Sequence, residues 1–119
     1  MSSHFHITPF DPHQYGGEPL PKIVDERDFI PAIKLIWPEI KIWPTPHYGG
    51  VAAWELNYFP DHDPTKDFMQ GDVDQDGWVG LNARIKMTTL TNFSIWYRNF
   101  VPPEYRLFLW YESNVKPVE

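Results

Sequence analysis

Residues 68–87 of the chain read FMQGDVDQDGWVGLNARIKM, and this stretch decides the fold. The pair Asp76-Gly77 is typical of a two-residue turn in a β-hairpin, because Gly accepts the positive φ that such turns require. After the turn, apolar and polar side chains alternate along residues 79–87. This alternation is the pattern of a strand with one buried and one solvated face. The stretch therefore predicts an antiparallel hairpin whose outgoing strand covers residues 79–87.

A strand and a helix are expected before the hairpin. Residues 51–59, VAAWELNYF, alternate in the manner of a half-buried strand. Residues 28–37 carry apolar side chains at helical spacing. Pro31 has no N–H and is best tolerated in the first helical turn. We therefore expect Asp28 to cap this helix, with Asp25 as the alternative.

Two further elements are expected after the hairpin. Thr91 is a good helix-capping residue, and aromatic side chains recur at helical spacing as far as Phe100, before a pair of prolines ends the helix. Residues 105–111, YRLFLWY, are apolar on both faces apart from one arginine, which is typical of an interior strand. The remaining residues 113–119 read as a polar tail.

Two segments of the N-terminal half carry weaker patterns. Residues 3–8, SHFHIT, alternate in the manner of a short strand or an extended arm. Pro44 and Pro46 bound an extended linker before the strand at 51–59. Together the elements predict an α+β fold: a single, mostly antiparallel sheet of three to five strands, packed with two main helices.

The composition fits one domain that covers residues 1–119. Of these residues 42% are hydrophobic, which is enough for a core at this length without disulfides or metals. The chain has no Cys, which excludes disulfides, Cys-ligated zinc and thiol nucleophiles. The first ten residues resemble no signal peptide, and no apolar run approaches the ~20 residues of a membrane span. We therefore expect a cytoplasmic protein that does not contact a membrane.

The net charge of −6 is concentrated in one part of the chain. Residues 55–76 hold seven acidic residues against Lys66 as the one base, which is −6 by itself. A net negative charge disfavours nucleic acid as a partner. A local excess of this kind suits a surface that faces a basic protein or a cation, and a solvated acidic loop is the alternative interpretation.

Aromatic residues add a second feature of a binding surface. Four of the six Trp residues lie on predicted core faces, whereas Trp43 and Trp78 do not; the four are Trp37, Trp54, Trp96 and Trp110. Exposed Trp and Arg together are typical interface anchors, and covering the hairpin end is the alternative role of Trp78. The sequence thus predicts a partner-binding set of seven residues: Asp61, Asp63, Asp72, Asp74, Asp76, Trp78 and Arg84.

Two patterns suggest a metal site instead. Asp72-Val-Asp74-Gln-Asp76-Gly77 matches the opening of a calcium loop, but Ala83 occupies the twelfth position, where a bidentate Glu is needed. His4 and His6 form an HxH pair on one face of an extended segment. No nucleophile motif, phosphate-binding loop or HExxH is present. We therefore expect no enzymatic activity and no cofactor.

The C-terminal half of the chain carries a resemblance, mainly over residues 76–109. Residues 93–109 (FSIWYRNFVPPEYRLFL), with the Asp76-Gly77 strand pair and residues 29–38 (FIPAIKLIWP), resemble small bacterial cytosolic proteins. Some of these proteins are similar to the immunity proteins of polymorphic-toxin and contact-dependent inhibition systems. The matching positions are mainly apolar: Trp96, Tyr97, Phe100, Val101, Pro102, Leu107 and Leu109.

The resemblance implies a protein that binds and inhibits a toxin. Many such toxins act on nucleic acids and present basic clefts, which an acidic surface complements. The expected function is therefore an immunity-like inhibitor of a basic, toxin-like partner. Two alternatives remain open at this point: a metal-binding protein or metal-dependent enzyme that uses His and Asp residues, and a structural homo-oligomer.

Overall fold

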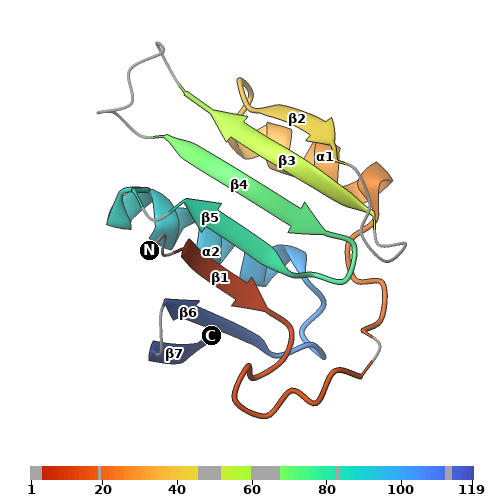
Figure 1. The fold of residues 1–119 in the computed structure, drawn as a ribbon. Coiled ribbons are helices and arrows are strands. Elements are labelled where there is room, and N and C mark those ends of the chain that lie inside the picture. Colours follow the sequence, from red (N-terminus) through yellow and green to blue (C-terminus); the bar gives the residue numbers. More distant parts are fainter. Residues whose placement is uncertain (1–3, 19, 46–51, 60–67, 83, 112–113) are drawn as a thin grey trace.

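One sheet and two helices make up the fold (Figure 1). The computed structural model describes residues 4–18, 20–45, 52–59, 68–82, 84–111 and 114–119. The elements in chain order are β1 His4–Thr8, α1 Glu26–Ile36, β2 Lys41–Pro44, β3 Ala53–Tyr58, β4 Met69–Asp74, β5 Val79–Asn82, α2 Met87–Phe100, β6 Leu107–Tyr111 and β7 Asn114–Val118.

The sheet has seven strands in the order β2-β3-β4-β5-β1-β6-β7, and every neighbouring pair is antiparallel. The prediction of an α+β fold with an antiparallel sheet and two helices is correct in class. The predicted count of three to five strands is wrong. The N-terminal segment is a full strand, and it lies inside the sheet between β5 and β6.

The two edge strands account for the wrong strand count. β2 contains Pro44, where the predicted linker begins, and β7 contains Pro117, within the predicted polar tail of residues 113–119. Proline removes a backbone N–H, which excludes it from central strands but not from an edge, where one row of donors needs no partner. β2 pairs with β3 and β7 pairs with β6. The prolines therefore mark the borders of the sheet.

The predicted hairpin is present, but its second strand is shorter than expected. Gly77 has φ +92, and its N–H donates to the carbonyl of Asp74. β5 ends at Asn82, whose Oδ1 accepts from the Arg84 N–H at 2.8 Å and turns the chain. The alternation in the sequence continues to residue 87 because Ile85 is buried, although it lies in the turn after β5. Met87 is exposed and begins α2.

Both helices begin earlier than the sequence pattern suggested. The N-cap of α1 is Asp25, the alternative, and its Oδ1 accepts from the Arg27 N–H at 2.9 Å. The N-cap of α2 is Lys86, without a side-chain capping bond, and Thr91 lies inside the helix. The capping preference of Thr91 was misleading, because the helix already begins at Met87, directly after the turn that Asn82 and Arg84 form.

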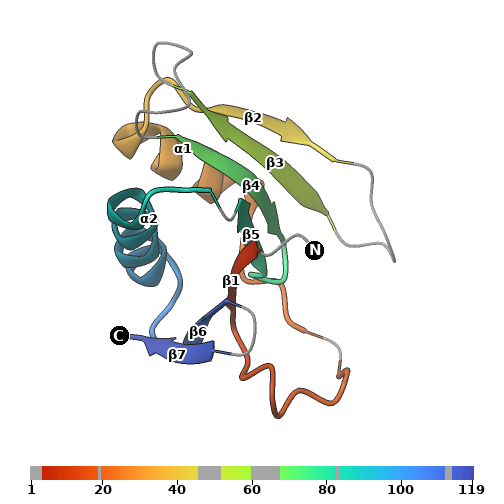
Figure 2. The same ribbon diagram turned by 60° about the vertical axis from the view of Figure 1, so that its left-hand side comes forward.

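Both helices pack on the same face of the sheet (Figure 2). The core lies between them and the sheet, and its fully buried residues include Phe29 and Ile33 of α1 and Phe93 and Tyr97 of α2. The Tyr97 hydroxyl donates to the Gly77 carbonyl at 2.8 Å and ties α2 to the hairpin turn. We call the side of the sheet that the helices cover the helix face, and the opposite side the open face.

Candidate interaction surface on the open face

One row of side chains crosses the whole open face. The registers of the six strand pairs place its members directly opposite one another, from edge to edge: Trp43, Glu55, Asp72, Gly80, His6, Trp110 and Val115. Directly opposite residues on one face of an antiparallel pair are close neighbours. The row therefore brings acidic and aromatic side chains from five segments of the chain onto one surface.

The six Trp residues divide equally between the two faces. Trp37, Trp54 and Trp96 pack with the helix-face core. Trp43 is 43% exposed, on the edge strand β2. Trp78 and Trp110 are half-buried and contact His6, which places them on the open face. The expectation that Trp110 belongs to the core is wrong, because the register of β6 turns it to the other side.

His6 joins the two central Trp residues. Its ring stacks on Trp110, with 4.3 Å between ring centroids, and its Nδ1 accepts from Trp78 Nε1 at 3.2 Å. Trp110 Nε1 in turn donates to Thr8 Oγ1 at 3.3 Å. Because Nδ1 accepts this hydrogen bond, the ring is held as the neutral Nε2–H tautomer. Burial lowers the pKa of His6, and nearby His4 lowers it further.

Carboxylates lie beside this aromatic cluster. Asp72 is exposed, yet partial loss of its hydration raises its pKa, as does the charge of Glu55, while His4 and the Gly80 N–H act in the opposite direction. Burial, Asp76 and Asp72 raise the pKa of Asp74 to about 6. The negative charges of β3 and β4 thus repel one another in the free protein.

Cations lie at the borders of this acidic area. Lys41 is on the edge strand β2, opposite Asn57. The guanidinium of Arg106 lies 5.2 Å from the ring centroid of Phe108, on β6. The centre of the open face, over β3, β4 and the hairpin turn, is therefore negative.

The row is hollow at Gly80. A cavity of about 310 Å³ opens there, lined by His4, His6, Gln70, Gly71, Asp72, Gly80, Leu81 and Asn82. A Cβ at Gly80 would lie 3.0 Å from Asp72 Oδ1 and 3.7 Å from His6 Nδ1. Because Gly80 has no side chain, the space between the carboxylate and the imidazole is open.

The predicted binding residues are only partly brought together. Asp72, Asp74, Asp76 and Trp78 lie close to one another on β4 and the hairpin turn. Arg84 is exposed in the turn after Asn82, at the opposite end of β5 from Trp78, so the structure does not bring these two members of the predicted set together. Asp61 and Asp63 lie outside the described residues.

The predicted set of seven binding residues does not contain His6 or Trp110, and Glu55 belongs only to the wider acidic segment 55–76. Glu55 reaches the row through the pairing of β3 with β4, whereas His6 and Trp110 join it through the position of β1, whose neighbours β5 and β6 are distant in the sequence. The alternation of residues 3–8 placed His4 and His6 on one face but gave no sign of their neighbours. Within the described segments, no group of three or more His, Asp or Glu side chains is arranged to hold a metal ion.

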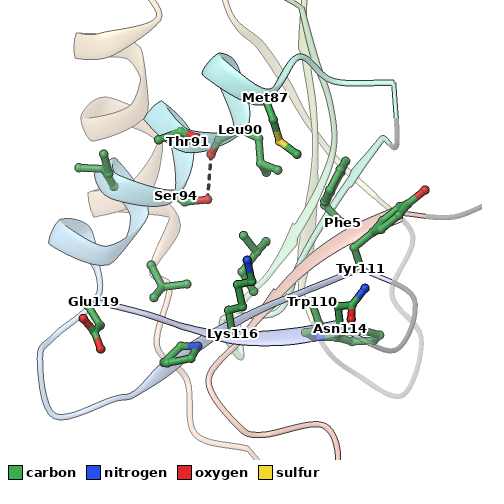
Figure 3. A pocket seen from close by; sticks show the side chains of 14 residues that line it. Phe5, Met87, Leu90, Thr91, Ser94, Trp110, Tyr111, Asn114, Lys116 and Glu119 are labelled. Atoms are coloured by element: carbon green, nitrogen blue, oxygen red, sulfur yellow. Dashed lines mark hydrogen bonds between the residues drawn. The ribbon is translucent and has the colours of Figure 1, made fainter.

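A larger groove of about 750 Å³ lies on the helix face between α2 and the β6–β7 hairpin (Figure 3). Its walls are mainly apolar, with Met87 and Leu90 above and Lys116 rising from β7 into the space. Lys116 and Glu119 are the charged residues among its lining. The groove has no excess of either charge, so it does not complement a basic partner.

Comparison with known proteins gives no match: no family model, no curated protein and no solved structure is similar to the chain. The geometry itself defines the class of fold, an α+β protein with a seven-stranded antiparallel sheet and two helices on one face. Neither helix is long and apolar enough to cross a bilayer.

Proposed function

We propose that the chain is an immunity-like, protein-binding inhibitor that neutralises a basic, toxin-like partner in the cytoplasm through the open face of its sheet. The observation that carries the proposal is the row across this face, where Glu55 and Asp72 stand between exposed Trp43 and the Trp78–His6–Trp110 cluster. The resemblance of residues 76–109 to immunity-type proteins agrees with this function but does not carry it.

The electrostatics of the face favour a basic partner. Burial and two neighbouring carboxylates raise the pKa of Asp74 to about 6. An incoming cation would therefore stabilise the charged form of this carboxylate most. Lys and Arg of a partner would relieve the repulsion and accelerate encounter. Tryptophan supplies the large apolar contacts that dominate binding energy at interfaces, and three Trp residues border this charge.

The open face favours this function over the two alternatives. A metal centre would need ligands that the described residues do not bring together. A homo-oligomer formed through a sheet edge would have to pair with β2 or β7, and each contains a proline that interrupts a continuous ladder. A face that binds a partner needs neither catalytic groups nor a cofactor.

The test compares two variants with the same change in charge. In one, Asp72, Asp74 and Asp76 become Asn, which keeps the acceptor for the Trp78 N–H. In the control, exposed Glu26, Asp28 and Glu104 become Gln, Asn and Gln. Each protein is immobilised and used to capture partners from the producing cell, and the association rate of the captured protein is measured over a salt series.

The expected partner is basic, associates more slowly as salt rises, and is lost by the Asp72/Asp74/Asp76 variant but not by the control. Screening acts beyond a Debye length of ~8 Å at physiological ionic strength, so the salt dependence reports on long-range steering. Equal association rates for wild type and the triple variant at low salt would overturn the proposal. Expression of the partner alone should arrest growth, and expression of the partner together with the wild-type chain should not.

A further inference from the structure

The hollow over Gly80 has a composition that selects one kind of ligand group. Asp72 supplies a carboxylate on one side, and the amide side chains of Gln70 and Asn82 lie nearby, with Asn82 Oδ1 also accepting from the Arg84 N–H. His6 borders the other side, fixed by its stack on Trp110 and by the hydrogen bond from Trp78. The cavity therefore offers the Asp72 carboxylate, two amide side chains and the rim of a rigid aromatic cluster.

A guanidinium group matches this lining better than other charged groups do. It is planar, carries five N–H donors and no acceptor, pairs with a carboxylate through two parallel hydrogen bonds and stacks on aromatic rings. A phosphate or carboxylate would meet the negative charge of Asp72. An ammonium group would satisfy the charge but would leave the aromatic rim without a planar partner.

We propose that the hollow over Gly80 receives an arginine side chain of the basic partner. This inference rests on the proposed function and names the contact at the centre of its surface. The guanidinium donates to the Asp72 carboxylate and lies beside the His6 ring. The volume of about 310 Å³ lies at the lower end of the range for small-ligand pockets, which suits one side chain rather than a whole peptide.

Gly80 makes the proposal testable without a change in charge. Its φ is not in the left-handed region, so a side chain is conformationally allowed there. Gly80→Ala places a methyl group 3.0 Å from Asp72 Oδ1, and Gly80→Val fills more of the space. A β-branched residue suits a strand, and Gly80→Ala remains as the milder variant if Gly80→Val folds poorly.

The probe is N-acetyl-L-arginine methylamide, titrated into the full chain at pH 8. The chemical shifts of the Trp78 and Trp110 indole groups report binding. The corresponding lysine derivative and the neutral citrulline derivative are the matched comparisons. We expect the arginine probe to bind about tenfold more tightly than citrulline, since citrulline has the same shape but no charge.

Gly80→Val and Asp72→Asn should each lower the affinity for the arginine probe about tenfold. Asp74→Asn, which lies outside the hollow, should change this affinity less. Equal binding of arginine and citrulline, or an unchanged affinity in both Gly80 variants, would refute the arginine site. If those results occur while the Asp72/Asp74/Asp76 variant still loses the captured partner, the proposed function stands without this contact. If the probe binds as expected but the partner associates with the triple variant as fast as with wild type, the proposed function fails instead.

Discussion

Individual side chains on the open face are held in protonation states that matter for stability. Asp74 is the clearest case, because burial, Asp76 and Asp72 raise its pKa from 3.8 to about 6. Between these two values the folded protein binds more protons than the unfolded chain. The free energy of unfolding therefore falls as the pH rises through this window.

Asp74→Asn should stabilise the free protein at pH 8 and leave its stability nearly unchanged at pH 3, where the carboxyl is neutral in both states. The melting temperature measured by circular dichroism at the two pH values checks this. Glu104→Gln, an exposed position outside the open face, removes the same charge as a control. A loss of stability at pH 8 would show that Asp74 makes a favourable contact that its raised pKa does not reflect.

His6 provides a second test at the same scale. The Trp78 N–H stabilises the neutral ring by donating to Nδ1, and burial acts in the same direction. Trp78→Phe removes the donor and should raise the pKa of His6 toward 6.5, as measured by nitrogen chemical shifts over a pH series. At neutral pH the wild-type spectrum should show the Nε2–H tautomer. A protonated Nδ1 in wild type would contradict the described bond.

Among the elements, α2 is tied to the hairpin turn by a buried hydrogen bond. The Tyr97 hydroxyl donates to the Gly77 carbonyl at 2.8 Å, at the turn that also positions Asp76 and Trp78. Tyr97→Phe leaves this buried carbonyl without its donor, which costs ~1–3 kcal/mol of unfolding free energy. Denaturant unfolding measures the loss. Tyr111→Phe, which keeps the ring that stacks on Phe5, is the control and should cost less.

The start of α1 gives a second test among the elements. Asp25 accepts the Arg27 N–H, and this backbone bond is the main cause of its lowered pKa. Its contribution to stability is therefore present above its ordinary pKa and is lost as the pH falls through the lower, folded value. Asp25→Ala should lower the melting temperature at pH 7 by more than Asp28→Ala, and the difference should shrink in strong acid. Equal effects would mean that the cap is not Asp25.

The elements also show which parts of the fold the sequence could predict. Helix α1, strand β3 and the Asp76-Gly77 hairpin were recognised, because their patterns depend on neighbours in the sequence. β2 and β7 were missed, because Pro44 and Pro117 argue against a strand until an edge position is known. The start of α2 was misplaced, because the turn at Arg84 interrupts an alternation that Ile85 continues by chance.

For the whole molecule, the division into two faces decides what the protein offers to a partner. The acidic residues of β4 were predicted as a binding surface from charge alone. His6 and Trp110 could not be added, because only the placement of β1 between β5 and β6 brings them beside Trp78. Pairing between segments so distant in the sequence leaves no local pattern. The sequence thus indicates the acidic residues of the surface, but not the strand order that brings His6 and Trp110 beside them.

The most direct measurement uses the equal division of the Trp residues between the faces. The chain is labelled with 5-fluorotryptophan, each fluorine resonance is assigned by a Trp→Phe variant, and the captured basic partner is added. We predict that the resonances of Trp43, Trp78 and Trp110 shift or broaden, while those on the helix face, from Trp37, Trp54 and Trp96, keep their positions. Changes confined to the helix-face set would contradict the claim that the open face binds the partner.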